Sequence, residues 1–192
     1  MNGIQDRPTT MRISQFGADT VISGKTRLIL MDCFETLVVL KDGNYEPRQG
    51  VVKFLDHFTG KHALPIAVIS DATAVAVNAA LRQAKLFSRI RDIYHVENAS
   101  EALSAGRLRK RLDIPLRDYA LHPDQAVFIG DSPLDAEAAA HYGVPFIRVP
   151  RSEDQNFSFA GLIKGPSRYD SGEFLGNMLR TFQPVSGPSD HS

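Results

Sequence analysis

The stretch Arg27-Leu-Ile-Leu-Met-Asp32 is a short, continuous apolar run that ends on a carboxylate, and it decides the fold. Such a run is typical of a central strand in a parallel sheet, buried on both faces. Two further stretches repeat the pattern, Pro65-Ile-Ala-Val-Ile-Ser70 and Ala126-Val-Phe-Ile-Gly130, and Asp131 follows the second of them. Ligands of such sheets bind beyond the carboxyl ends of the strands. We therefore expect Asp32, Ser70 and Asp131 to converge at one edge of the sheet.

The alternation of strands and helical segments along the chain predicts an α/β fold with a central, mainly parallel, five-stranded sheet between two layers of helices. The two remaining strands are expected at residues 93–96 and 145–149, and a loop or hairpin at 41–47. Helices are expected over residues 51–58, 74–86, 98–112, 133–142 and 174–182. We divide the chain into an N-terminal extension (1–26), one domain (27–182) and a flexible C-terminal tail (183–192).

Length and composition fit one domain of ordinary size, with 192 residues of which 43% are hydrophobic. The formal net charge is zero, and no basic run is interleaved with aromatic residues, so neither nucleic acid nor a membrane is an expected partner. The single cysteine, Cys33, excludes an intrachain disulfide and a cysteine zinc site. The chain does not open with a basic segment followed by an apolar stretch, and we expect a cytoplasmic protein.

Two carboxylates stand in Gly130-Asp131-Ser-Pro-Leu-Asp135, where a strand gives way to a helix. A carboxylate at a strand end, such as Asp32, serves as a metal ligand, a nucleophile or a simple turn or helix cap. Taken alone, Asp32 favours the cap. The pair Asp131 and Asp135 changes that balance, because closely spaced carboxylates suit a divalent cation and the groups that surround it.

At these residues the chain resembles the haloacid dehalogenase-like (HAD) superfamily. The first motif of that superfamily is an Asp, three residues and then Thr or Val, here Asp32 to Thr36. The second is a Ser or Thr that ends the next strand, here Ser70, and the fourth is Gly-Asp-x3-Asp, here Gly130 to Asp135. The resemblance covers roughly residues 26–150. It implies a Rossmann-like three-layer sandwich that usually carries out phosphoryl chemistry.

The resemblance also implies a role for each matched residue. Asp32 would attack phosphorus and form an aspartyl-phosphate, and the hydroxyl of Ser70 would donate to the phosphoryl oxygens. Mg²⁺ would be held by Asp32, the backbone carbonyl of Phe34 and Asp131, with Asp135 supporting that shell. A cation matters because a carboxylate cannot easily attack a dianionic phosphate unless positive charge screens the repulsion.

The third motif of the superfamily is a Lys or Arg upstream of the fourth strand. Several basic residues crowd the helix expected over residues 98–112, namely Arg107, Arg109, Lys110 and Arg111. We favour Lys110, from its distance before Asp131, as the cation that neutralises Asp32 and the phosphate. Arg107 and Arg111 stay open as alternatives. The plainer interpretation is that all of these residues solvate one helix face.

Two further residues are candidate substrate contacts. Arg48 lies in Pro47-Arg-Gln-Gly50, which resembles a turn common in HAD members without a cap domain, but a surface turn arginine is the preferred interpretation. Asp71 would either contact substrate or cap the helix that follows it, and capping is preferred.

Phe34 and Glu35 depart from the family pattern. HAD phosphatases usually carry a second Asp at the first of these positions, where it protonates the leaving group, and Gly at the second. Phenylalanine cannot transfer a proton. Four interpretations stay open: a 2-haloacid dehalogenase, a phosphohydrolase or phosphotransferase whose leaving group needs little acid help, Glu35 as a substitute acid or base, and a catalytically weak binding or regulatory domain. The dehalogenase is disfavoured, because the chain keeps Asp131 and lacks that enzyme's helical cap.

The spacing of the motifs leaves no room for a substantial cap domain, since only residues 37–69 separate the first motif from the second. We therefore expect an open site. Members without a cap often act on large substrates or have a partner subunit that covers the site. The loop at Gly43 and the stretch 151–169 are the candidates for substrate contact.

Overall fold

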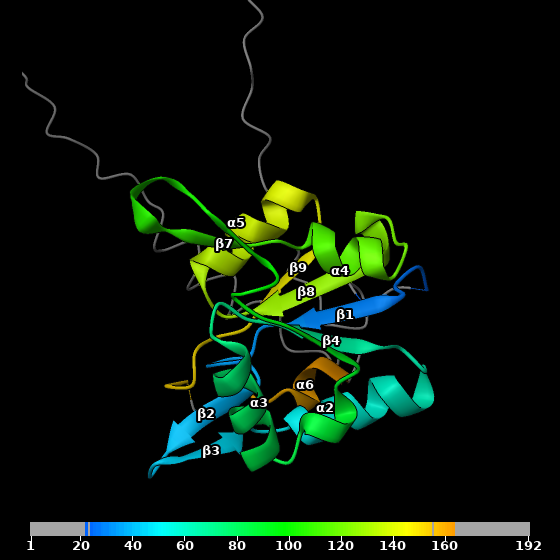
Figure 1. Ribbon diagram of the computed structural model, residues 1–192. Coiled ribbons are helices and arrows are strands. Elements are labelled where there is room, and N and C mark those ends of the chain that lie inside the picture. The colour runs from blue at the N-terminus through cyan, green and yellow to red at the C-terminus, as the bar shows by residue number, and fades with distance from the viewer. Residues whose placement is uncertain (1–21, 23, 155, 164–192) are drawn as a thin grey trace, which may run out of the picture.

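The computed structural model describes residue 22, residues 24–154 and residues 156–163 (Figure 1). The helix expected over residues 174–182 and the C-terminal tail lie outside the described residues, as does most of the N-terminal extension. Among the helices that the structure describes, none has the length and apolar character needed to cross a bilayer.

A five-stranded sheet forms the centre of the molecule, and each neighbouring pair of its strands is parallel. The strand that the opening apolar run predicts, β1, lies in the middle, with Met31 between Val68 of β4 and Ile129 of β8. In spatial order the strands are β5 (Asp92–Tyr94), β4 (Ile66–Ile69), β1 (Leu28–Met31), β8 (Ala126–Gly130) and β9 (Phe146–Arg148). The predicted fold class and the five predicted strands are confirmed.

Two layers of helices cover the sheet (Figure 1). Alternate residues of β1 face opposite layers: Ile29 packs in a core cluster with Phe54 of α2, whereas Leu30 packs in a second cluster with Ala139 of α5. The first layer holds α2 (Val51–Asp56), α3 (Ala74–Gln83) and α6 (Ala160–Ile163), and the second holds α4 (Asp113–Asp118) and α5 (Pro133–Tyr142). Short turns complete the layers: a π-helical turn η1 (His57–Lys61) and the 3-10 turns η2 (Phe87–Arg89), η3 (Ser104–Gly106) and η4 (Pro123–Gln125).

The hairpin expected near residues 41–47 is confirmed as an antiparallel pair, β2 (Val38–Lys41) and β3 (Asn44–Pro47). Asp42 and Gly43 form its turn with φ of 50° and 79°. Positive φ at both central residues is the geometry that an Asp-Gly pair favours in a two-residue hairpin.

The helix predicted over residues 98–112 is wrong, because that segment folds as a second antiparallel hairpin, β6 (Ser100–Ala102) and β7 (Leu108–Lys110). The leucines that suggested a helical face do not share one buried side: Leu112 is fully buried, whereas Leu108 is 41% exposed. Gly106, at a φ of 71°, allows the chain to reverse between the two strands. Lys110 is the last residue of the second strand of this hairpin.

Candidate active site

Polar residues follow three neighbouring strands at the carboxyl edge of the sheet: Asp32 after β1, Ser70 after β4 and Asp131 after β8. The backbone N–H of Asp32 still donates to the carbonyl of Ile129 at 2.9 Å, so sheet pairing fixes the main chain up to the carboxylate. Asp32 and Asp131 are each 5% exposed and Ser70 is fully buried. The three residues lie together where their strand positions lead us to expect them.

The carboxylates of Asp32, Asp131 and Asp135 form a compact cluster in which one oxygen from each residue lies within 4.8 Å of the others. An all-oxygen donor set of this kind suits a hard cation such as Mg²⁺. None of the hydrogen bonds in the described residues uses the carbonyl oxygen of Phe34, which leaves a further oxygen beside Asp32 available as a ligand. The residues present therefore fit the divalent cation that the family implies.

The ammonium of Lys110 bridges two of these carboxylates. Its Nζ donates to Oδ1 of Asp32 at 2.6 Å and to Oδ1 of Asp135 at 2.5 Å. Burial raises the pKa of Asp32 to about 7, because loss of hydration outweighs the attraction of Lys110. Burial by itself lowers the pKa of Lys110, but the charges of Asp32 and Asp135 reverse that effect and hold it above its ordinary value. Lys110 is thus a fixed positive charge against the cluster.

Of the three basic residues that the sequence leaves as candidates for the third motif, Lys110 contacts the cluster, whereas Arg107 and Arg111 pair with other residues. Arg107 pairs with Glu137 at 2.6 Å, and Arg111 pairs with Asp113 at 2.6 Å. Lys110 is the last residue of a strand instead of part of the predicted helix, which corrects its placement. Arg109, the residue before Lys110 in the strand, pairs with Glu101 at 2.6 Å, as expected where successive side chains of a strand lie on opposite sides.

Asp135 is held by the start of α5. Ser132 caps this helix, and its Oγ accepts from the backbone N–H of Asp135 at 3.1 Å and donates to Oδ2 of Asp135 at 2.7 Å. The backbone N–H of Ser132 donates to the same carboxylate oxygen at 3.1 Å, which completes a capping box. A Cβ at Gly130 would lie 2.6 Å from Oδ2 of Asp135, so any larger residue here would displace the Asp135 carboxylate.

Both oxygens of Asp131 accept hydrogen bonds from side chains. Thr36, which is fully buried, donates through Oγ1 to Oδ1 at 3.0 Å. Arg151 donates through Nε to Oδ2 at 3.1 Å, although its own side chain is 62% exposed. One oxygen of Asp131 is thus fixed from within the protein, and the other is paired with a residue at the surface.

Arg48 joins the loop after Asp32 to the segment that follows β9. Its guanidinium donates to the carbonyl oxygens of Glu35 at 2.5 Å, Pro150 at 2.7 Å and Arg151 at 3.2 Å. The side chain is buried, with an exposed fraction of 6%, so the interpretation as a surface turn arginine is wrong. Through these three hydrogen bonds the guanidinium holds the loop after Asp32 to the segment after β9.

Glu35 and Phe34 are the two departures from the family pattern. The side chain of each contacts another residue of the protein. Glu35 adopts the left-handed conformation with a φ of 59°, where glycine would be unstrained. Its carboxylate accepts hydrogen bonds from the Oγ and the backbone N–H of Ser152. The ring of Phe34 lies 5.4 Å from that of Tyr45 on β3, centroid to centroid, and packs against the core.

Asp71 does not cap the helix that follows it, contrary to our expectation. Thr73 is the N-cap of α3, and its Oγ1 accepts from the backbone N–H of Ala76 at 3.3 Å. Ser70, one residue before Asp71, has its Oγ accepting from the backbone N–H of Ala72 at 3.3 Å. This contact uses the Ser70 oxygen as an acceptor and does not use the hydroxyl proton.

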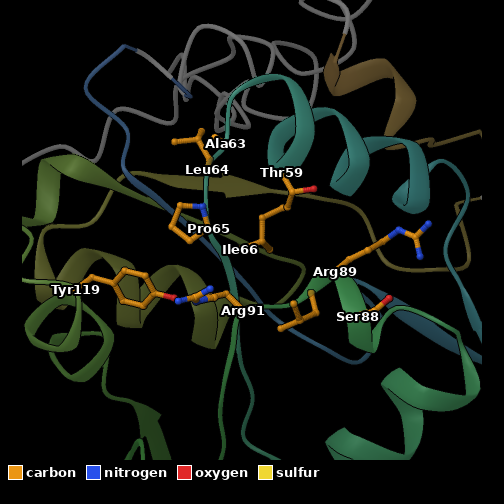
Figure 2. Close-up of a pocket in the computed structure, with 10 residues that line it drawn as sticks. Thr59, Ala63, Leu64, Pro65, Ile66, Ser88, Arg89, Arg91 and Tyr119 are labelled. Atoms are coloured by element: carbon orange, nitrogen blue, oxygen red, sulfur yellow. The ribbon is translucent and has the colours of Figure 1, made fainter.

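A cleft of about 720 Å³ lies elsewhere, at the amino end of the sheet (Figure 2). Its lining includes Pro65 and Ile66, where β4 begins, together with Arg91 and Tyr119. Because Ser70 stands at the opposite end of the same strand, the cleft is separate from the carboxylate cluster. Ligands of parallel sheets bind at the carboxyl end, so we place the functional site at the cluster and not in this cleft.

From the sequence, Arg151 and Ser152 are expected only as members of the stretch 151–169 that would contact substrate, and Ser132 is not expected in the site. Ser132 carried a signal, since Ser-x-x-Asp before a helix is a capping-box pattern. Arg151 and Ser152 stand just beyond the carboxyl end of β9, in a stretch that looks irregular from sequence alone. Their position after the edge strand was the available signal, since the other site residues follow strands in the same way.

Comparison with known proteins identifies the family and the fold of the chain. A family profile described as haloacid dehalogenase-like hydrolase matches residues 34–149, a range that contains Ser70, Lys110, Asp131 and Asp135 and begins just after Asp32. No curated protein matches the chain.

Several solved structures share the fold. A predicted phosphoglycolate phosphatase from Haemophilus somnus 129pt is 13% identical with a TM-score of 0.55, over 72% of this chain and 97% of that chain. A HAD-superfamily hydrolase of subfamily IA, variant 1, from Geobacter sulfurreducens PCA is 16% identical with a TM-score of 0.52, over 66% and 92%. A haloacid dehalogenase-like family hydrolase from Streptococcus pneumoniae is 13% identical with a TM-score of 0.52, over 66% and 85%. The family profile spans more than half of the sequence, and the chain therefore belongs to the haloacid dehalogenase-like hydrolase family.

Proposed function

We propose that this chain is a Mg²⁺-dependent phosphohydrolase or phosphotransferase that acts through an aspartyl-phosphate at Asp32. The observation that carries the proposal is the contact of Lys110 with Asp32 within the buried carboxylate cluster. Burying several carboxylates together is costly, and one ammonium does not neutralise them. Buried carboxylates that do not serve core packing are typical of a site that binds a metal cation and an anionic substrate.

The residues of the site divide the work of phosphoryl transfer. Lys110 occupies Oδ1 of Asp32, and no hydrogen bond of the described residues reaches Oδ2, which leaves that oxygen to attack phosphorus. As the new bond to Oδ2 forms, the bond from phosphorus to the leaving group breaks. Ser70 and Lys110 supply fixed donors to the phosphoryl oxygens. Mg²⁺, held by Asp32, the carbonyl of Phe34 and Asp131 with Asp135 behind them, would screen the negative charge of the incoming phosphate.

The substrate that the site favours has a good leaving group. Phe34 stands where a proton donor is usual in the family, and it cannot protonate a departing alkoxide. The Glu35 carboxylate accepts a hydrogen bond from the Ser152 hydroxyl, so it acts there as an acceptor and not as a proton donor. Acyl phosphates release a carboxylate and phosphoanhydrides release a phosphate. Both leaving groups are weak bases that need little help from a general acid. We therefore propose one of these classes over simple alkyl phosphomonoesters.

We further propose that the site is open towards a large substrate or a covering partner subunit. Between β1 and β4 the described chain forms the β2–β3 hairpin, α2 and η1, without a separate cap domain. A single hairpin excludes water poorly, and a partner surface would improve this.

Hydrolysis assays test the proposed function. The full chain is incubated with a panel of acyl phosphates, phosphoanhydrides and phosphomonoesters, with and without Mg²⁺, beside Asp32→Asn. We expect turnover of the first two classes that requires Mg²⁺ and is lost in Asp32→Asn. Turnover that is equal in Asp32→Asn, or a complete lack of turnover across the panel, contradicts the proposal.

The alternative is a HAD-fold domain that has lost catalysis and serves as a binding or regulatory module, which Phe34 favours. A 2-haloacid dehalogenase is a weaker candidate, since its chemistry uses no metal and does not require Asp131. The same panel separates these functions when a 2-haloacid is included, because only a dehalogenase would release halide without Mg²⁺. If the chain is an inactive module, the Asp32→Asn variant should bind the partner as tightly as the wild type does.

A further inference from the structure

The ion pair between Arg151 and Asp131 joins an exposed surface side chain to a buried one. Nε of Arg151 lies 3.1 Å from Oδ2 of Asp131, and the two side chains are 62% and 4% exposed. The carboxylate raises the pKa of the Arg151 guanidinium further above its already high value, so the arginine stays charged. A positive side chain therefore occupies an oxygen of one of the cluster's three carboxylates.

The backbone around Arg151 is held from two directions. Arg48 donates to the carbonyl oxygens of Pro150 and Arg151, and Ser152 donates to Glu35. The main chain at Arg151 is thus tied to the loop that follows Asp32. Any change of partner by the guanidinium must come from side-chain rotation, which costs little at an exposed arginine.

A divalent cation and the Arg151 guanidinium compete for Asp131. Thr36 already donates to Oδ1 of Asp131, so a metal ion that binds this carboxylate competes with the positively charged Arg151 for Oδ2. Thr36 is fully buried and neutral, so it can stay on Oδ1. Arg151 alone can turn into solvent, and after doing so its guanidinium still lies at the rim of the site, anchored by its backbone.

We propose that Arg151 is a further phosphate-binding residue beside Ser70 and Lys110: a divalent cation displaces its guanidinium from Asp131 and so frees it to bind the substrate's phosphoryl group. The inference rests on the proposed function and names the anionic group that Arg151 takes, a phosphoryl dianion. A guanidinium fits this group because its planar N–H donors match phosphate oxygens two at a time. The exchange couples substrate binding to a loaded metal site.

Metal binding without substrate tests the first half of the inference. Isothermal titration of the full chain with Mg²⁺ compares the wild type with Arg151→Gln and with Arg148→Gln. Arg148 is an exposed β9 arginine nearby that makes no hydrogen bond to Asp131 in the described residues, so its loss controls for a general change of charge. We expect Arg151→Gln to bind Mg²⁺ about three to five times more tightly, as loss of a competing ion pair predicts, and Arg148→Gln to bind like the wild type.

Phosphate binding tests the second half. With saturating Mg²⁺, titration with inorganic phosphate should show affinity falling about tenfold or more in Arg151→Gln, because a charge-assisted hydrogen bond is lost. Arg148→Gln should bind phosphate like the wild type. Arg151→Gln failing either to tighten Mg²⁺ or to weaken phosphate overturns this inference alone, as does an equal change in Arg148→Gln. A wild-type chain that binds no Mg²⁺ overturns the inference and the proposed function together.

Discussion

Lys110 contacts Asp32 through a 2.6 Å hydrogen bond between Nζ and Oδ1, and both side chains are almost completely buried. They lie 78 residues apart in sequence, and a hairpin end brings one to the strand end that carries the other. The same ammonium also contacts Asp135 at 2.5 Å. Lys110 therefore links the strand that bears the proposed nucleophile to the helix that supports the proposed metal site.

Replacing Lys110 by Met should destabilise the protein and abolish activity. The variant leaves Asp32 and Asp135 buried close together without a cation, and breaking one partner out of a buried ion pair costs roughly 3–5 kcal/mol. Urea unfolding measures the free energy, and turnover of the best substrate measures catalysis.

The double variant Lys110→Met with Asp32→Asn is the control. Removing the Asp32 charge relieves part of the cost, so the double variant should lose less stability than the sum of the single variants. Additive losses would mean that the two side chains do not interact as the structure describes.

Replacing Gly130 by Ala should weaken metal binding. The added Cβ would meet the Asp135 carboxylate at 2.6 Å, and accommodating it should cost roughly 1–3 kcal/mol of stability. Displacing a group that supports metal ligands should lower Mg²⁺ affinity about 10–100-fold. Gly161→Ala serves as the matched control, since a Cβ there meets nothing within 4 Å. Unchanged Mg²⁺ affinity in Gly130→Ala would argue against Asp135 as a support of the metal.

Two N-cap substitutions separate helix stability from site function. Ser132→Ala and Thr73→Ala each remove the side-chain cap of one helix, α5 or α3, and each should cost about 1 kcal/mol. Only Ser132 also contacts Asp135, so calorimetry should show weaker Mg²⁺ binding in Ser132→Ala and wild-type binding in Thr73→Ala. Equal Mg²⁺ affinity in the two variants would show that Ser132 caps the helix but does not support the metal site.

Restoring a carboxylate with Phe34→Asp should extend activity to alkyl phosphomonoesters. General acid catalysis contributes typically about 10²–10⁴-fold, and these substrates are the class that needs it most. Acyl phosphate turnover should change much less. Steady-state rates on paired substrates of both classes measure the difference, with Phe34→Asn as the isosteric control that carries no titratable proton. A gain in Phe34→Asn as large as that in Phe34→Asp would show that proton transfer is not the cause.

The sheet and the polar residues at its carboxyl edge could be predicted from sequence, because the signals are local. The buried strands are continuous apolar runs, and α5 begins at Ser132-Pro133 and ends at Gly143, whose φ of 67° suits a glycine C-cap. Asp32 and Asp131 follow directly from these strand ends.

The environment of Arg48 and the partners of Arg151 could not be predicted in this way. The three carbonyls that bury Arg48 come from residues 35, 150 and 151, and nothing local in the sequence indicates that they meet. The segment before Lys110 was misassigned for a related reason: leucines at positions 103, 108 and 112 resemble a helical face, but tertiary pairing selects a hairpin. The spacing of the motifs predicts Lys110 itself, but not the strand that carries it.

Trapping the phosphoryl group on the protein tests the central claim most directly. The full chain with Mg²⁺ is mixed with an acyl phosphate, quenched in acid within the first turnover, digested and analysed by mass spectrometry. We predict one added phosphoryl group on the peptide that contains Asp32, absent without Mg²⁺ and absent in Asp32→Asn. A phosphoryl group on another residue, or equal labelling of Asp32→Asn, would contradict Asp32 as the nucleophile.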